Sequence, residues 1–221
     1  MSVLVYTESE NGKFKKASFE LATYAKTIAD KMGVDLTALT INNGTPGEIG
    51  EYGITKTLDV KSDQLNEFNA EAYANVIAQA AKKVNANVVV ISQTANACYL
   101  APMLAVDLGA GYASNVVETP ELDNGFTVKR TAFTNKAFNH TSISSDIKLI
   151  GLSTNSFGIK KNEVEVSTEE FTPELPDDLF KITVEEVDQN TDKVSIADAE
   201  IVVSGGRGLK GPDNWHLIEN L

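Results

Sequence analysis

The residues best suited to chemistry form a glycine-rich loop near the end of the 221-residue chain. Gly206, Gly208 and Gly211 have the spacing G-x-G-x-x-G. They lie between an apolar run at 199–204, which predicts a buried strand, and a helix predicted to start at Pro212. Glycines let backbone N–H groups approach a phosphate, and a helix start adds partial positive charge. The loop predicts a phosphate-bearing cofactor, with these candidate cofactor-binding residues: Gly205, Gly206, Arg207 and Gly208.

The same loop has a second interpretation, in which it is a tight strand-to-helix turn that binds nothing. The acidic residue expected about 20 positions further on in dinucleotide-binding motifs would fall past Leu221. Lys210 is followed by glycine, so the loop is not a Gly-Lys-Ser/Thr phosphate loop. Arg207 has little steric cover from its glycine neighbours, so its guanidinium could meet a phosphate or a ring. A solvated loop arginine is the alternative.

The other reactive side chains do not form a catalytic or metal-binding set. Cys98 lies near a predicted helix start, but its apolar neighbours favour an inert, buried thiol. His140 and His216 have no second His or Cys at metal-ligand spacing. An acidic run is interpreted as a solvated face, and its members are Glu163, Glu165, Glu169, Glu170 and Glu174. We expect no catalytic residue and no metal site.

The charge balance argues against several classes of partner. The net charge of -12, from 31 acidic and 19 basic residues, opposes binding to nucleic acid and to anionic membranes. No apolar run approaches the roughly 20 residues of a membrane span. Met1 leads directly into an apolar run without a signal segment, and the single Cys98 cannot form an internal disulfide. We therefore expect a cytoplasmic protein.

Alternating apolar and amphipathic segments predict an α/β fold. Strands are predicted at 2–7, 34–41, 54–60 and 87–91, and helices at 17–32, 70–84 and 97–108. This order implies a mostly parallel, Rossmann-like sheet flanked by helices. Further strands follow without helices between them, at 114–118, 126–133, 141–144 and 147–152. With a hairpin signal at Asp123-Asn124-Gly125, they predict an antiparallel extension of the sheet.

The last fifty residues predict a change of domain. Residues 171–178 are acidic, contain two prolines and are expected to form a surface connection, and another strand is predicted at 182–187. We expect an N-terminal α/β domain at 1–188, a polar linker at 189–198, and the start of an incomplete second α/β domain at 199–221.

Several segments carry a likeness to a known family. Residues 193–215, above all the run Val203-Ser204-Gly205-Gly206-Arg207-Gly208-Leu209-Lys210, resemble the start of the flavin domain in the electron transfer flavoprotein alpha subunit. A looser likeness covers residues 3–8 and 88–93. Arg130-Thr131-Ala132-Phe133, followed by Asn135-Lys136-Ala137, is similar to the family's Arg-Thr, aromatic, Gly-Asn-Ala stretch, with Lys136 inserted.

The resemblance implies a bacterial heterodimer with the family's beta subunit and one FAD, held largely by the C-terminal domain of alpha. Such a protein takes electrons from dehydrogenases and passes them to a quinone-linked or other acceptor, so it is a carrier and not an enzyme. Of the family's flavin-contacting residues, Arg207 carries over, while later Ser-Arg, Gln-Thr-Gly, Ser-Gly-Ala-Ile-Gln-His and Asn-Lys-Asp segments are absent. We expect a fragment that binds the beta subunit, holds no FAD alone and self-associates.

A different class of function remains open from the residues themselves. The chain could be a stand-alone module that binds a small nucleotide at the carboxyl edge of its parallel sheet, or that only binds other proteins. Neither form of this alternative has a redox role.

Overall fold

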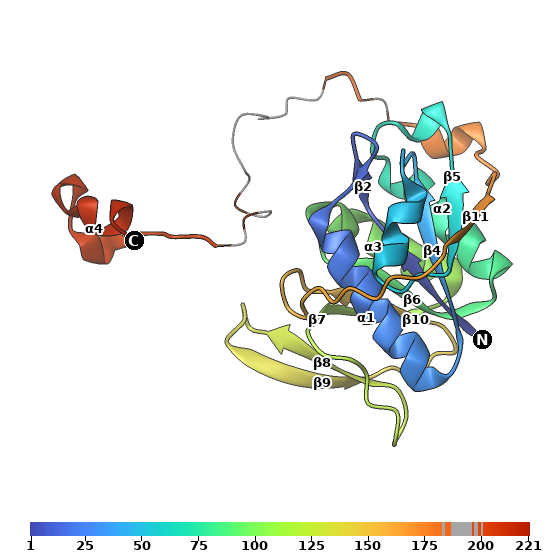
Figure 1. Cartoon of the computed structure of the whole chain (residues 1–221), viewed down its shortest axis with the longest axis horizontal. Coiled ribbons are helices and arrows are strands. Elements are labelled where there is room, and N and C mark those ends of the chain that lie inside the picture. Colours follow the sequence, from blue (N-terminus) through green and yellow to red (C-terminus); the bar gives the residue numbers. More distant parts are fainter. Residues whose placement is uncertain (183, 187–195, 197–198, 200) are drawn as a thin grey trace. The chain divides into compact units, whose positions relative to one another are not determined.

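The computed structural model describes residues 1–182, 184–186, 196, 199 and 201–221 (Figure 1). It divides into two units, Met1–Val184 and Glu185–Leu221. The predicted linker at 189–198 lies outside the described residues, apart from Ile196.

The first unit is built on one large, mostly parallel sheet. Within the described residues, nine strands lie in the order β11-β5-β4-β1-β6-β10-β7-β8-β9. The strands that pair in parallel are β1 (Ser2–Tyr6), β4 (Asp35–Ile41), β5 (Lys56–Val60), β6 (Ala86–Ser92), β7 (Gly111–Val116), β10 (Lys148–Leu152) and β11 (Ser167–Glu170). The strands β8 (Thr127–Ala132) and β9 (Ala137–Ser142) complete one end as an antiparallel ribbon. The predicted α/β fold is confirmed.

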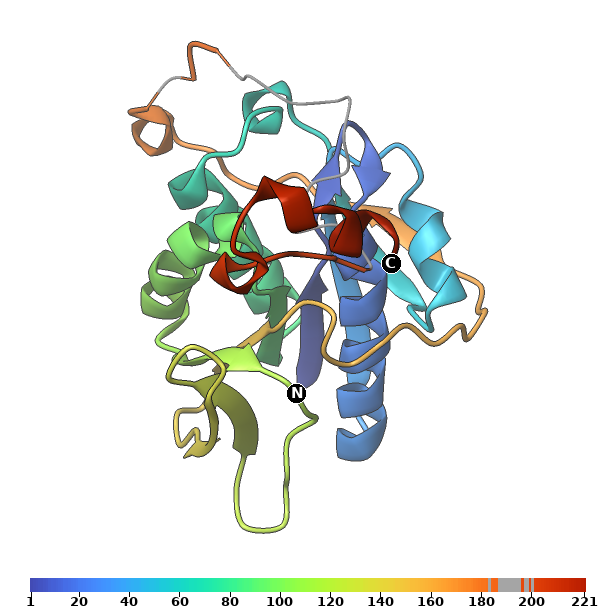
Figure 2. The ribbon, with the colours of Figure 1, turned by 90° about the vertical axis from the view of Figure 1, so that its left-hand side faces the viewer.

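Three helices cover the two faces of this sheet. They are α1 (Lys16–Met32), α2 (Ala70–Lys83) and α3 (Ala95–Leu108). Figure 2 shows α1 to one side of β1 and the pair α2 and α3 to the other. Helix α1 ends at Gly33, which has φ 64° and whose N–H bonds to the last helical carbonyls.

The alternation of side chains along the strands divides the core into two layers. Val3 and Val5 of β1 face the layer under α1, while Leu4 and Tyr6 face the layer under α2 and α3. Central strand β6 is buried on both faces, which explains its almost continuous run of valine and isoleucine. The two layers hold the sheet rigid, so that the loops after its strands are fixed in place.

Short elements complete the first unit. A small hairpin is made by β2 (Ser9–Glu10) and β3 (Lys13–Phe14), and 3-10 helices lie at Pro46–Glu51, Asp63–Leu65 and Asp177–Phe180. The turn predicted at Asp123-Asn124-Gly125 is present, because Gly125 has φ 100° and Glu121 bridges Thr127 in antiparallel sense just outside it. The surface connection predicted at 171–178 also agrees with the structure.

Three features of the sheet differ from the prediction. β7 and β10, both expected in the antiparallel extension, pair in parallel with each other, and β10 lies between β6 and β7, since Leu149, Ile150 and Leu152 make it apolar enough for a central position. β9 begins earlier than the predicted strand at 141–144, because the loop of the ribbon ends at Lys136. β11 was not predicted, since its exposed Ser-Thr-Glu-Glu sequence has no apolar side to signal a strand.

Helix α3 also corrects a burial prediction. Cys98, predicted to be buried, is exposed, and Met103 of the same helix is 44% exposed. The helix is apolar on nearly every side, so its sequence does not mark which face meets the sheet.

The second unit is described by itself and holds short elements only. Its described residues form 3-10 turns at Arg207–Leu209 and Pro212–Asn214 and the helix α4 (His216–Glu219). The strand predicted at 199–204 is wrong for residues 201–204, which are exposed and unpaired, and the strand predicted at 182–187 is absent from 182 and 184–186. A β-strand needs a neighbouring strand to satisfy its backbone groups, and the described residues offer none there.

Candidate functional site

The glycine loop of the second unit is an open turn. Arg207 and its glycine neighbours are exposed, and open space surrounds Gly206, Gly208 and Gly211, where a side chain would meet no atom within 4 Å. The amides of Leu209 and Lys210 donate to loop carbonyls at 3.0 and 3.1 Å, so they are not free for a phosphate. Without a flanking strand, and with a helix α4 of four residues, the described residues of this loop do not form an FAD site by themselves.

The carboxyl edge of the parallel sheet is the second candidate ligand-binding site. The chain leaves β1 toward β4 on one side and later returns to β6 on the other, so the strand order reverses between β1 and β6. Ligands of open α/β sheets bind at such a reversal, beyond the carboxyl ends of the strands. Here the residues that follow the two strands are Glu8 and Thr94.

Glu8 fills this position with the chain's own carboxylate. The residue is 4% exposed, its Oε1 accepts a 2.5 Å hydrogen bond from Thr94 Oγ1, and its buried Oε2 has no partner among the described residues. Burial raises the pKa of the Glu8 carboxyl, and the bond from Thr94 partly opposes that rise. Thr94 also caps α3, since its Oγ1 accepts from Ala97 N at 3.2 Å. A carboxylate held beside this helix start repels a phosphate, which argues against a nucleotide site at this edge.

A small polar network lies beside Glu8 at the same edge. Tyr112 donates its hydroxyl to Gln93 Oε1 at 2.9 Å, and Gln93 Nε2 lies 3.5 Å from the thiol sulfur of Cys98. Burial raises the pKa of Tyr112. The exposed thiol corrects the predicted burial of Cys98 and leaves it open to reagents, without a general base beside it in these contacts.

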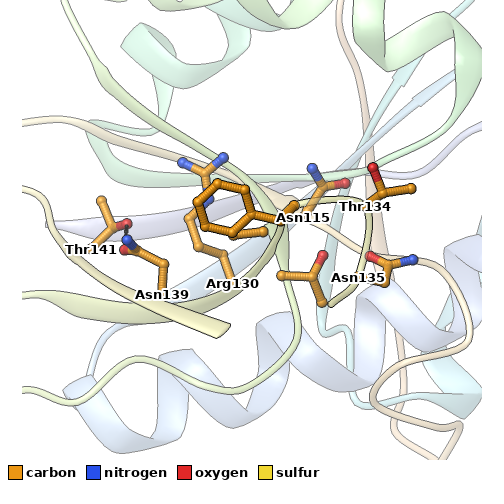
Figure 3. A pocket seen from close by; sticks show the side chains of 9 residues that line it. Asn115, Arg130, Thr134, Asn135, Asn139 and Thr141 are labelled. Carbon is orange, nitrogen blue, oxygen red and sulfur yellow. Dashed lines mark hydrogen bonds between the residues drawn. The ribbon is translucent and has the colours of Figure 1, made fainter. Parts of the chain in front are cut away.

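A third candidate lies at the far end of the sheet, where the ribbon of β8 and β9 meets β7. A cavity of about 600 Å³ opens there, and Figure 3 shows side chains of nine residues that line it. Its polar side chains come from β7, β8, the turn and β9, and they include Asn115, Arg130, Thr134, Asn135 and Asn139. Arg130 Nη2 donates to Ser114 Oγ at 3.0 Å, which ties the guanidinium to β7. We call this cavity the ribbon pocket.

The predicted histidines and acidic run take no part in these places. His140 is exposed on β9 and His216 begins α4, while Glu169 and Glu170 lie on the exposed strand β11. The described part of the chain holds no cluster of three or more His, Cys, Asp or Glu side chains that could hold a metal ion. No helix among the described residues is long and apolar enough to cross a membrane.

The sequence did not single out Glu8, Thr94 or the ribbon pocket. Glu8 directly follows the strand predicted at 2–7, and Thr94 lies three residues after the strand predicted at 87–91, so their places near strand ends are the signal that could have drawn attention to each. The sequence marked residues 130–137 only for their likeness to a family stretch, and it did not indicate a pocket, because Asn115 comes from a segment that only the sheet order brings beside them.

Comparisons with known proteins agree with this architecture. The model of the family described as "Electron transfer flavoprotein domain" matches residues 3–175. The protein FixB of Clostridium saccharobutylicum is 26% identical over 232 residues, covering 99% of this chain and 68% of its own. The electron transfer flavoprotein subunit alpha of Bacillus subtilis is 25% identical over 228 residues, with coverage of 99% and 68%. A probable mitochondrial subunit alpha of Caenorhabditis elegans is 26% identical, with coverage of 100% and 65%.

The sheet and its covering helices define a parallel α/β protein with a ribbon extension. The chain belongs to the electron transfer flavoprotein domain family, because the family model covers more than half of its length. The predicted family is therefore confirmed, and with it the likeness to alpha-type proteins.

Proposed function

We propose that this chain is the alpha-type subunit of an electron carrier that works with a beta subunit. The observation that carries the proposal is the alignment of 99% of the chain, including the Gly-Gly-Arg-Gly loop, with proteins named electron transfer flavoprotein subunit alpha. The described residues assemble no nucleophile, base and orienting group that would suggest an enzyme with its own substrate. Dehydrogenases supply the electrons in this proposal, and a quinone-linked or other acceptor removes them.

The two units take different tasks in this proposal. In it, residues 1–188 bind the beta subunit. Residues 189–198 connect this domain to residues 199–221, which contribute to the flavin domain. The rigid two-layer core of the first unit suits a docking platform, because preformed surfaces lose little entropy on binding. The guanidinium of Arg207 is exposed and has no partner among the described residues, so it is available to contact a ligand.

FAD belongs to the assembled carrier and is not held by these 221 residues alone. A dinucleotide needs a crevice whose contacts offset the entropy lost on binding, and the described glycine loop provides an exposed turn instead. We propose Arg207, Gly205, Gly206 and Gly208 as contacts that the loop adds to a flavin site completed by other residues. When bound, the flavin supplies the electron chemistry.

To test this proposal, the chain is expressed alone and together with a beta subunit from the same genome. Light scattering after gel filtration should show a one-to-one heterodimer, and the chain purified alone should be colourless. Separate elution of the two chains would overturn the partner proposal. Stoichiometric flavin absorbance in the chain alone would overturn the statement about FAD.

The role of Arg207 is tested in whichever assembly retains flavin. Arg207→Ala should lower flavin retention, because a guanidinium contact with an anionic group is lost. Arg207→Lys should keep part of it, and Lys210→Gln is the matched control, since it removes a charge from the same loop. Equal retention in all four proteins would mean that Arg207 is a solvated loop residue.

A further inference from the structure

The ribbon pocket combines features that point to a ligand independent of the electron-carrier role. It is lined by one arginine and by asparagine and threonine side chains, and none of its lining residues, all in the described part of the chain, is acidic. The whole chain carries a net charge of -12, so a cationic pocket without carboxylates is unusual on its surface. Such a pocket attracts an anion through its local field.

The polar side chains of the pocket have hydrogen-bonding capacity to spare. Arg130 uses Nη2 to donate to Ser114, and no other side-chain bond of this guanidinium is found within the described residues. The side-chain amides of Asn115 and Asn135 have no protein partner among those same residues. Figure 3 shows Arg130, Asn115 and Asn135 gathered around the cavity from three different elements. Guanidinium and amide N–H groups are the donors that bind phosphate oxygens.

The turn that carries Asn135 is held in a costly conformation. Phe133, Thr134 and Asn135 have φ of 51°, 55° and 60°, so three successive residues other than glycine are left-handed. A left-handed residue with a Cβ costs on the order of 1 kcal/mol, and a β-branched one such as Thr134 more. Backbone strain of this kind is concentrated at ligand clamps and active sites. Both Phe133 and Asn135 of this turn line the pocket.

Phe133 adds an apolar contact at the same place. Its ring is 82% exposed although it lines the pocket, so an incoming flat group could stack on it. A cavity of about 600 Å³ is within the usual range for small-ligand sites, and it is larger than a single phosphate needs. An anionic group and a ring together describe a nucleotide.

We propose that the ribbon pocket binds a mononucleotide, with the phosphate on Arg130, Asn115 and Asn135 and the base on Phe133. The neighbouring cation Lys129 is already paired with Glu118 and lies over the Phe138 ring, so Arg130 is the charge that faces the cavity. The proposed ligand is a small molecule and not a protein, because the pocket offers contacts for one phosphate group and one aromatic ring.

The test measures binding to the full chain by isothermal titration calorimetry at low salt. The probes are uridine and guanosine monophosphates, the two nucleosides and inorganic phosphate. Mononucleotides should bind more tightly than phosphate or nucleosides, and added salt should lower the affinity for mononucleotides. Absence of mononucleotide binding at millimolar concentration would overturn the proposal.

Variants separate a built site from general surface charge. Arg130→Gln should weaken mononucleotides about tenfold or more, as expected for loss of a charge-assisted contact. Phe133→Ala should lower the affinity for mononucleotides but leave the affinity for inorganic phosphate unchanged. Lys136→Gln is the matched control, because it removes a charge from the same turn without lining the pocket. An equal loss in Lys136→Gln and Arg130→Gln would overturn the proposed site.

Two further variants guard against a change in folding. Ser114→Ala removes the acceptor of the Arg130 hydrogen bond but keeps the guanidinium, so mononucleotides should still bind. Arg130→Lys keeps the charge and should bind more tightly than Arg130→Gln. If Ser114→Ala loses binding as fully as Arg130→Gln does, the arginine is structural and the assignment to phosphate fails.

Discussion

The hydroxyl of Thr94 joins two parts of the fold, because it donates to Glu8 Oε1 at 2.5 Å and accepts from Ala97 N at 3.2 Å. The first bond reaches the loop after β1, and the second caps α3. The buried carboxylate and the helix start are thus connected through one oxygen atom.

Replacing Glu8 by Gln should change how stability depends on pH. Burial raises the pKa of Glu8 in the folded state above its ordinary value of 4.5. The folded state therefore holds the proton more tightly than the unfolded state, and stability falls as pH rises from about 4.5 through the folded pKa. Glu8→Gln lacks this loss, so its stability relative to the parent should increase across that window. Urea unfolding at several pH values measures the difference, and a difference that is constant with pH would contradict the prediction.

Replacing Thr94 by Ala should cost about 1–2 kcal/mol of unfolding free energy for the helix cap alone. The loss should be larger at neutral pH than in acid, because the ionised Glu8 then has no donor. Thr94→Ser keeps the hydroxyl and is the control. Equal stability of the Ala and Ser variants, measured by urea unfolding, would show that the hydroxyl is not needed.

Replacing Thr134 by Gly should stabilise the first unit by about 0.5–1 kcal/mol, because glycine adopts φ 55° without the steric cost of a β-branched side chain. Thr131→Gly, in the regular strand β8, should instead destabilise. Thermal unfolding compares the two variants, and a destabilising Thr134→Gly would mean that the threonine side chain supports the turn.

Replacing Gly151 of β10 by Ala should destabilise the first unit by about 1 kcal/mol, the net contribution of one hydrogen bond. A Cβ on Gly151 would collide with Gln93 Oε1 and lie 3.1 Å from the Tyr112 hydroxyl. Gln93 would have to move, which breaks its bond with Tyr112. The double variant with Gln93→Ala should recover part of the loss, and strict additivity in this double-mutant cycle would contradict the proposed collision.

The sequence predicts the central elements of the fold well and its edges poorly. The apolar runs of β1 and β6 and the periodic face of α1 each identify a buried element, because burial determines side-chain type at those positions. Neighbours are not encoded in the same way: the apolar run of β10 predicts burial but not its place between β6 and β7. An edge strand such as β11 has no buried face and leaves no pattern.

The candidate sites show the same division. The glycine spacing predicted a loop at Arg207, but spacing does not report whether a strand pairs beside it, and residues 201–204 remain unpaired. Glu8 and Thr94 are ordinary residue types whose proximity depends on two strands that are 80 residues apart in the chain, so local sequence does not reveal their contact. The exposure of Cys98 was missed for a similar reason, since α3 is apolar on most sides.

The place of β10 has a consequence for the order in which the chain assembles. β7, β8 and β9 are made before β10, yet within the described residues their ribbon reaches the parallel strands through β10 alone. During synthesis the ribbon must wait until residues 148–152 have left the ribosome before it can join the sheet. Closing such a distant pairing is slow compared with forming local helices. A nascent chain halted just before β10 would carry a folded β1–α3 segment and an unattached ribbon, the form most exposed to chaperones.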